Sequence, residues 1–539
     1  MSGREHSSSQ RDPDRPVLCA ALLSSACAML RDGGEVAEAI DRIETVLGTQ
    51  VRDVAWQHGL LGMSVARPPG DRNANLFCLP HLLEILQDHA GRLPAAVVER
   101  VREATRLTVA FAERRWDEEV FDPHRDFKAY SNIFVLYCQA LLLAGLHARD
   151  ERLLRAAEGQ WRRWHSHVAY YGIDEFCSPT YNDIIYTALR RMHGAARSEW
   201  MREQIRDVLD HVVALQYAIA HPRLGLPVCG ASRDYRRFLS PGGGRLRLFD
   251  EEADGDGYVR PAAVRAEYAG RRWPHHVRGR ATTWPFRFGC WQSEGAAVGT
   301  MTGGNYFPQQ IHWMAAVGEA PDRRAVAWLP GGFAITNGFV AQRDAEALCV
   351  FARREVPYTR TQETVPDDRA AALLAERGFY RFGLGLSDGW DRVERAGPRL
   401  VTRAYGHTLV VQPFLIDGEQ VRAMALRAER SKPRQCRQAF DEHLFDDEAA
   451  WFGCHVWLGA GAQPRPAVGV CVERADRRIE VRSDDGLAVR LFRQPAGEVT
   501  ELYDEDWRTT PLLACPTGAL WPGELAARSA ARGAALSGG

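Results

Sequence analysis

The sequence predicts a multidomain α+β protein in which an N-terminal α/α toroid, partial or complete, is followed by a C-terminal antiparallel β-sandwich. Hydrophobic residues recur with the period of a helix from residue 17 to about 220, and with a period of two after about 281. In the helical part, a polar and aromatic-rich loop precedes an apolar helix three times, at intervals of about 50 residues. These observations fix the fold class and the order of its two parts.

The helical part alternates inner and outer helices. Segment 131–146 is apolar nearly all round, which is typical of an inner helix, whereas 151–165 is rich in Arg and Glu with Leu and Trp on one face. Inner and outer helices joined by short turns are typical of an α/α toroid. The expected helices span 17–31, 35–47, 94–115, 131–146, 151–165, 180–193 and 197–219.

The second part alternates short strands with Gly, Asp and Pro turns, as in a sandwich. The expected strands include 296–301, 346–351, 408–415, 454–458, 468–472 and 487–492. The predicted boundaries are a disordered tail (1–16), a toroid domain (17–240), a linker (241–280), a sandwich domain (281–523) and a flexible tail (524–539).

The composition disfavours some classes of partner and indicates a cellular compartment. The 539 residues are 45% hydrophobic and 25% charged, and the formal net charge of −1 gives no basic field for nucleic acid. No apolar run approaches the ~20 residues that span a bilayer, so we expect no membrane partner. Twelve scattered cysteines without a CxxC pair indicate buried thiols in a reducing compartment. The N-terminus does not resemble a signal peptide, so we expect a cytoplasmic protein.

The three polar loops are expected to emerge at one end of the helical layer, because successive hairpins are equally spaced. They span 71–77, 122–132 and 170–182. Polar side chains far apart in sequence would then meet at one mouth. Asn75 of the first loop is a predicted substrate-binding residue.

The third loop holds the densest group of chemical side chains. Pro179 behind Ser178, a possible N-cap, predicts where the helix begins. Tyr181 and Asn182 then lie in the first turn, where the helix dipole favours an anion, and Glu175 precedes them. We predict Tyr181 and Glu175 as catalytic and Asn182 as substrate-binding. The alternative is that Ser178 and Asn182 cap the helix, Tyr181 packs and Glu175 is solvated.

Two further segments also carry side chains that could bind a substrate or transfer a proton. Asn132, in Tyr-Ser-Asn, opens the neighbouring inner helix and either holds a substrate carboxylate or caps the helix. Arg233, in Gly-Ala-Ser-Arg-Asp-Tyr, offers a bidentate fork for a carboxylate or pairs with Asp234. Tyr235 supplies a second phenol and is predicted as catalytic.

The order of YSN, DEFxSPTY, GxSRDY and then Thr282-Thr283-Trp284 resembles heparinase- and alginate-lyase-like proteins of bacteria and fungi, over about residues 120 to 320. The resemblance implies a toroid and a sandwich with the cleft between them. It also implies β-elimination, with Asn132 or Glu175 neutralising a uronate carboxylate and Tyr181 or Tyr235 carrying the proton.

The chain departs from this pattern at the histidine that shares the proton transfer. His165 and His167 lie on a return helix, and His124 is the nearest candidate at the mouth. From the β region, Gln310 and His312 could reach the cleft, as could His407, although a strand histidine is more often structural. We predict His312 as catalytic and Gln310 as substrate-binding.

No cofactor and no metal are predicted. His275 and His276 are adjacent and cannot face one ion as a helical pair could, and 250–257 lacks the spacing of a calcium hand. Gly303-Gly304 is not followed by Gly-Lys-Ser/Thr, and no GxSxG nucleophile elbow between a strand and a helix is predicted. Nucleotide-dependent and serine-hydrolase chemistry are therefore disfavoured.

The leading functional prediction is a cofactor-independent acid/base lyase that acts on a carboxylate-bearing small molecule or oligosaccharide. One alternative keeps the fold but makes the protein a biosynthetic dehydratase, isomerase or cyclase of a small metabolite. A third possibility is a non-catalytic carbohydrate-binding protein. A site lined by Leu and Phe would favour the small metabolite, whereas aromatic platforms with Arg and Asn would favour a sugar.

Overall fold

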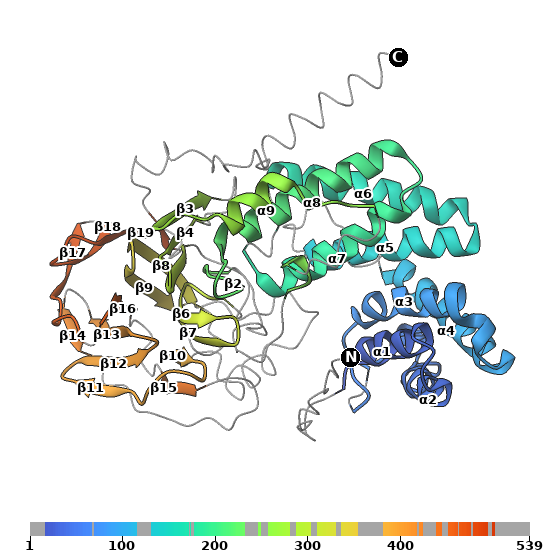
Figure 1. Ribbon diagram of the computed structural model, residues 1–539, viewed down its shortest axis with the longest axis horizontal. Helices are drawn as coiled ribbons and strands as arrows, with labels where there is room; N and C mark the ends of the chain where they lie inside the picture. Colours follow the sequence, from blue (N-terminus) through green and yellow to red (C-terminus); the bar gives the residue numbers. More distant parts are fainter. Residues whose placement is uncertain are drawn as a thin grey trace, which may run out of the picture. The chain divides into compact units, whose positions relative to one another are not determined.

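A computed structural model shows a helical region followed by antiparallel sheets, which confirms the predicted fold class (Figure 1). The residues that the structure describes are 17–66, 69–115, 131–171, 173, 177–231, 246–249, 257–280, 287–302, 310–329, 336–353, 381–417, 420–423, 438–444, 451–461, 463–475, 478–493 and 499–501. The chain forms two compact units. The first unit is Met1–Trp164 with Gly194–Arg202, and the second is His165–His193 with Glu203–Gly539.

The first unit is helical. Its elements are α1 (Cys19–Arg31), α2 (Val36–Leu47), η1 (Ala55–Gln57), α3 (Ala74–Glu84), η2 (Ile85–His89), η3 (Ala90–Arg92), α4 (Ala95–Arg115), α5 (Ser131–Ala148) and the start of α6 (Glu151–Tyr171). Apolar residues of α1 to α4 pack into one core, which includes Leu23, Ile43, Leu82 and Val101. This core explains the helical period of the sequence there.

The helix α5 is the inner helix that its all-round apolar sequence predicts. Among the described residues it is long and apolar enough to cross a membrane, with a mean hydropathy of 1.4, and 78% of it is buried within the protein. A helix that is apolar on every side is also typical of the buried core of a protein. We therefore describe α5 as a packed helix of the first unit.

The second unit combines helices and sheets. It takes the end of α6, most of α7 (Pro179–Ala195) and α8 (Glu199–Ile219), the hairpin β1 (Ala220–His221) and β2 (Leu226–Pro227), η5 (Arg247–Phe249) and α9 (Ala262–Ala269). Apolar side chains from the end of α8 pack on the first sheet, and the β1–β2 hairpin covers that sheet through Leu224, Leu226 and Val228.

Three antiparallel sheets follow. The first has the order β15-β10-β7-β6-β5-β4-β3, the second β11-β12-β13-β16-β9-β8 with β14 paired to β13, and the third β17-β18-β19-β20. The strands of the first sheet are β3 (His275–Arg280), β4 (Arg287–Gln292), β5 (Ala296–Thr302), β6 (Trp313–Ala320), β7 (Arg323–Leu329), β10 (Arg381–Leu386) and β15 (Gln438–Leu444). Those of the second are β8 (Thr336–Arg343), β9 (Glu346–Arg353), β11 (Glu394–Ala396), β12 (Arg399–Ala404), β13 (His407–Asp417), β14 (Gln420–Ala423) and β16 (Trp451–Ala460). The third holds β17 (Val470–Ala475), β18 (Arg478–Ser483), β19 (Ala488–Arg493) and β20 (Val499–Glu501).

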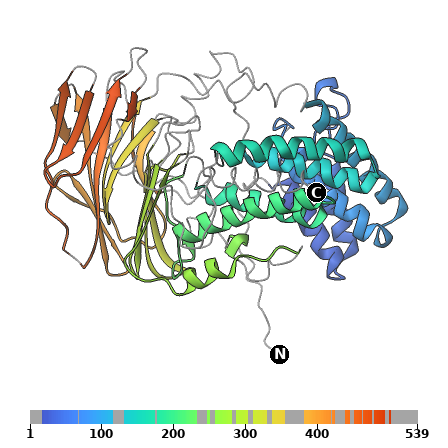
Figure 2. The same cartoon turned by 90° about the horizontal axis from the view of Figure 1, so that it is seen from above.

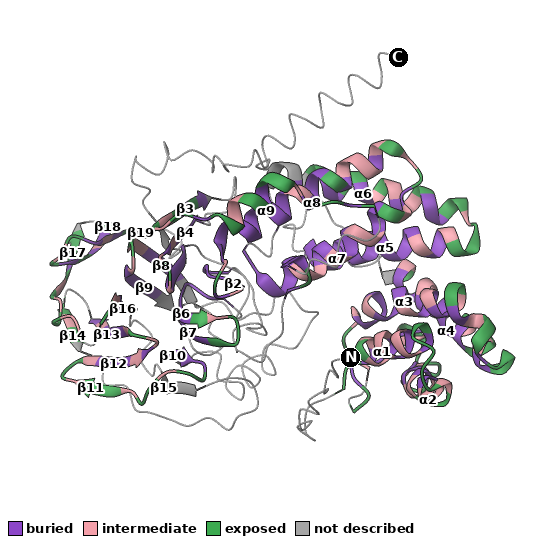
Figure 3. Cartoon of the chain, viewed as in Figure 1, coloured by how far each residue is buried: buried purple, intermediate pink, exposed green. Residues whose placement is uncertain are grey.

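The first two sheets form a sandwich. Their facing side chains, among them Val298, Trp313 and Phe351, make one buried cluster. The third sheet packs on the outer face of the second through a separate cluster, so the strands stack in layers (Figure 2). Most described residues of the first sheet are buried, because helices and the β1–β2 hairpin cover one face and the second sheet covers the other (Figure 3).

Two boundaries differ from the sequence prediction. The helix α3 begins at Ala74, inside the segment 71–77 predicted as a polar loop, so Asn75 lies inside the helix. Strand β3 begins at His275, inside the segment predicted as a linker, because residues 275–280 pair with β4 along their whole length. Of the cysteines that the structure describes, all but Cys471 are buried, in agreement with the prediction of buried thiols.

Candidate active site

The start of α7 is built as the sequence predicts. Ser178 caps the helix, because its Oγ accepts a hydrogen bond from the Tyr181 N–H at 3.2 Å and its carbonyl oxygen accepts one from Asn182 N at 3.0 Å. Cys177 enters the cap with a φ of +55°, a left-handed conformation that turns the chain into the helix. The cap occupies the Tyr181 N–H, so an anion at this helix end has to be held mainly by side chains.

Both predicted residues of the first turn are buried. Tyr181 is 3% exposed and Asn182 is 1% exposed. The side-chain oxygen of Asn182 makes no hydrogen bond with any residue that the structure describes. A buried acceptor without a partner is rare in folded proteins, since its desolvation is then uncompensated. Asn182 therefore remains a candidate substrate-binding residue.

Contacts within the second unit link this helix start to two segments that are distant in sequence. Cys177 packs in one apolar cluster with Cys229 and Met301. Ala231 pairs with Ile311 through two backbone hydrogen bonds of 2.8 and 2.9 Å. We call the region formed by Cys177–Asn182, Cys229–Ala231 and Gln310–His312 the helix–sheet junction.

Gly230 makes this convergence possible. A Cβ at this position would lie 2.4 Å from the Met301 backbone nitrogen and 2.8 Å from the Ile311 carbonyl oxygen. Only a residue without a side chain lets the segment approach β5 this closely. The sequence analysis did not assign Gly230 this role.

Gln310 and His312 flank the paired Ile311 and are both buried. His312 Nδ1 lies 3.1 Å from the Met301 carbonyl oxygen, and its ring packs edge-on against Phe351 at 5.6 Å. The ring also lies where a side chain at Gly338 would be. These contacts inside the sandwich favour the structural alternative for His312, whereas Gln310 remains a candidate binding residue.

Three predicted residues, Glu175, Arg233 and Tyr235, lie outside the described residues, as does His124.

Asn75 and Asn132 belong to the first unit. The Asn75 side chain is engaged with the backbone: its Oδ1 accepts from Leu61 N at 2.7 Å, and its Nδ2 donates to Gly59 O at 3.0 Å and to Thr108 O at 3.5 Å. Substrate binding by Asn75 would break these bonds, so we assign it a structural role. Asn132 is buried at the start of α5.

The other predicted histidines have separate surroundings. His165 is buried in α6, and burial lowers its pKa to about 4. The Nδ1 of His407, the first residue of β13, lies 2.9 Å from the Tyr405 carbonyl oxygen. Neither environment adds a proton carrier to the helix–sheet junction.

The buried thiols of Cys229 and Cys290 are poor nucleophiles. Burial raises the pKa of Cys229 well above its ordinary value, and burial raises the pKa of the neighbouring Cys290 to about 12. The thiolate is the reactive form of cysteine. Catalysis by these two thiols is therefore disfavoured.

Sequence analysis also missed Gln216. Both polar atoms of its amide are buried in α8 and make no hydrogen bond with the described part of the chain. Its neighbour Leu215 packs in the same apolar cluster as Cys177. The signal was present as a single amide in the apolar run 212–220, but a buried Gln in a helix more often bonds to a neighbouring element.

A separate pocket lies between β3, β4, β5 and β8. Its lining includes Arg278, Arg287, Trp291, Thr300 and Gln342, and none of the predicted site residues that the structure describes. Gln342 Oε1 accepts a hydrogen bond from Thr300 Oγ1 at 2.6 Å, so two of its polar groups bond to each other. We therefore place the candidate active site at the helix–sheet junction and not in this pocket.

No protein-family model matches the chain, and no curated protein matches it in sequence. Among solved structures the chain is similar to heparinase III, at 9% identity and a TM-score of 0.46, with 89% of this chain and 81% of that chain covered. It is also similar to the heparan sulfate lyase HepC from Pedobacter heparinus, at 10% identity and a TM-score of 0.37, covering 89% and 81%. A third is the Streptomyces coelicolor A3 chondroitin AC lyase in complex with chondroitin sulphate, at 12% identity and a TM-score of 0.39, covering 88% and 80%.

Proposed function

We propose that this protein is a cofactor-independent lyase that acts on a saccharide bearing a carboxylate. The observation that carries the proposal is the set of contacts at the helix–sheet junction, where Cys177 packs with Cys229, and Ala231 pairs with Ile311, the neighbour of Gln310. The order of sequence motifs that resembles heparinase- and alginate-lyase-like proteins supports the same chemistry.

In the proposed reaction, a base takes the proton from the carbon next to the carboxylate. The electron pair of that C–H bond forms a C=C bond, and the C–O bond to the leaving group breaks. The leaving oxygen then takes a proton from an acid. Because negative charge builds up on the carboxylate during proton abstraction, donors directed at this group lower the barrier.

The proposed roles follow from the side-chain chemistry. Tyr181 carries the proton, since a phenol can accept it as phenolate and return it as phenol. The amides of Asn182 and Gln310 bind the substrate. The Asn182 oxygen has no hydrogen-bond partner among the described residues, which supports this role. Glu175, Arg233 and Tyr235 remain proposed members of the site.

The test is a conversion assay with a panel of uronate-containing oligosaccharides, followed by the absorbance of the unsaturated product. Tyr181→Phe should abolish product formation with little loss of substrate binding. Tyr186→Phe is the matched control, because Tyr186 is a buried tyrosine of the same helix whose ring packs edge-on against Tyr258. Binding without product in the wild-type protein would instead indicate a carbohydrate-binding protein.

One observation favours the alternative of a small metabolite. Cys177 lies in an apolar cluster with Leu215, Ile219 and Phe288. Aromatic platforms with Arg are typical of sugar sites, whereas this surrounding suits a compact substrate. A dehydratase or isomerase would use the same proton abstraction, and turnover of a small hydroxy acid with no activity on oligosaccharides would identify it.

A further inference from the structure

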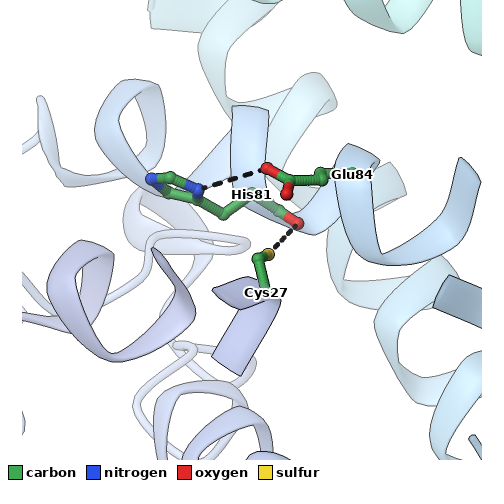
Figure 4. Close-up of side chains that lie close together, drawn as sticks. All are labelled: Cys27, His81 and Glu84. Carbon is green, nitrogen blue, oxygen red and sulfur yellow. Dashed lines mark hydrogen bonds and ion pairs between the residues drawn. The ribbon is translucent and has the colours of Figure 1, made fainter. Parts of the chain in front are cut away.

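A group of metal-ligating side chains lies in the first unit, in residues that the proposed function does not use. His81 and Glu84 lie one turn apart on α3, and the neighbouring helix α1 contributes Cys27 (Figure 4). Residues three apart on a helix share a face, so the imidazole and the carboxylate point to the same side. Helix packing brings the thiol to them, because α1 and α3 share one core.

The distances suit a single ion. His81 Nδ1 lies 3.8 Å from Glu84 Oε2, and the Cys27 thiol donates to the His81 carbonyl oxygen at 3.6 Å. One ligand atom from each of the three residues lies within 4.8 Å of the other two. A tetrahedral zinc ion needs ligand atoms about 3.3–3.8 Å apart. Small side-chain rotations would close the remaining gap.

A fourth group stands beside the carboxylate. The chain leaves α3 in a π-helical turn, η2, and this turn ends at His89. His89 Nε2 lies 3.9 Å from Glu84 Oε1, and His89 is only 6% exposed. π-helical turns are rare and often occur at functional sites.

The two imidazoles provide an independent sign of a ligand. His81 Nδ1 and His89 Nε2 are both buried, and neither makes a hydrogen bond with any residue that the structure describes. Both flank Glu84 at distances too long for a hydrogen bond. A cation shared between the nitrogens and the carboxylate would satisfy all of them.

Arg31 is the competing partner of this carboxylate. Its guanidinium lies 2.6 Å from Glu84 Oε1, but the Arg31 side chain is 63% exposed and can turn to solvent.

A second group of metal-ligating side chains differs, because its charges are already balanced. Glu346, His455 and Asp485 lie close together in the second unit, with His455 Nε2 2.9 Å from Glu346 and 3.2 Å from Asp485. Arg343 and Arg465 each contact both carboxylates there. Two guanidinium groups already balance two carboxylates, so this group needs no ion.

We propose that Cys27, His81 and Glu84 bind a divalent cation of the zinc class, with His89 as the fourth ligand or as a partner that orients Glu84. The mixed sulfur, nitrogen and oxygen donors select zinc over magnesium or calcium, which prefer all-oxygen sites. The sequence analysis predicted no metal site. The site is independent of the proposed lyase chemistry.

The experiment measures binding of Zn²⁺ alone to the full chain after chelation, by calorimetry and by elemental analysis of dialysed protein. Co²⁺ then serves as a spectroscopic probe, because a cysteine ligand gives a thiolate-to-cobalt charge-transfer band. The variants are Cys27→Ser, His81→Gln and Glu84→Gln. The matched controls are Cys19→Ser, another buried cysteine of α1, and His455→Gln from the group in the second unit.

We expect one high-affinity Zn²⁺ per chain. Each of the three variants should weaken binding by about 10-fold or more, since losing even an outer-shell partner has this effect. Cys27→Ser should also remove the charge-transfer band, while both controls bind as the wild type does. The proposal fails if wild-type protein binds no Zn²⁺, if it binds Co²⁺ without this band, or if only His455→Gln lowers the stoichiometry. The cobalt spectrum of wild-type protein decides the question even if a variant does not fold.

Discussion

Replacing Gly230 by alanine should separate the Cys229–Ala231 segment from the first sheet. The new Cβ would lie 2.4 Å from the Met301 nitrogen, whereas ordinary contacts begin near 3.4 Å, so the segment must move by about 1 Å. Such a shift stretches the Ala231–Ile311 hydrogen bonds, now 2.8 and 2.9 Å, beyond bonding range. Overpacking by a methyl group and the loss of two buried hydrogen bonds together should cost roughly 2–5 kcal/mol.

Urea unfolding measures the loss of stability, and hydrogen exchange at the Ala231 and Ile311 amides locates it. Gly159→Ala is the control, because nothing lies within 4 Å of a Cβ there and alanine favours the helix by up to about 1 kcal/mol. If the junction is also the active site, Gly230→Ala should lower turnover more than its stability loss explains. Unchanged amide exchange together with a stability change below about 1 kcal/mol would refute the close approach of this segment to β5.

Three further substitutions test the surrounding structure. Ser178→Ala should destabilise the protein by about 1 kcal/mol in thermal unfolding, because α7 loses its cap. Ser178→Asp should retain most of the wild-type stability, because aspartate also caps helices. Equal stability of wild type and Ser178→Ala would exclude the cap. Asn75→Ala should cost roughly 2–5 kcal/mol in urea unfolding, because Leu61 N–H and Gly59 C=O lose buried partners; a neutral effect would return Asn75 to the candidate binding residues. Burial lowers the pKa of His221 to about 4, so the folded state favours the neutral imidazole. The free energy of unfolding should therefore fall as the pH drops from 6.5 towards 4, by at most about 3 kcal/mol. In His221→Gln, the free energy of unfolding measured across that range should depend less on pH. An unchanged pH dependence would contradict the assignment.

The sequence predicted the elements better than the contacts between them. The six expected strands and most helices follow from periodicity, and the cap at Ser178 follows from a residue pair that is local in sequence. Strand β3 was missed because its residues, His275–Arg280, are polar and alternate weakly; pairing with β4 decides their conformation.

The arrangement of the candidate site could be predicted only in part. The position of Tyr181 and Asn182 in the first turn of α7 was predicted because a helix start is a local pattern, whereas the closeness of Cys177, Cys229 and Met301 depends on packing over more than a hundred residues. The proposed metal site also depends on packing between residues far apart in sequence, because Cys27 and His81 are 54 positions apart. A His-x-x-Glu spacing on a helix does not by itself distinguish a ligand pair from a solvated face.

The most direct test of the central claim follows the proton itself. The protein is incubated in D₂O with a carboxylate-bearing oligosaccharide or small hydroxy acid, and NMR measures deuterium at the carbon next to the carboxylate, together with new vinyl signals. The account predicts exchange or elimination with wild-type protein and Tyr186→Phe, and neither with Tyr181→Phe. Exchange that persists in Tyr181→Phe at the wild-type rate would contradict it.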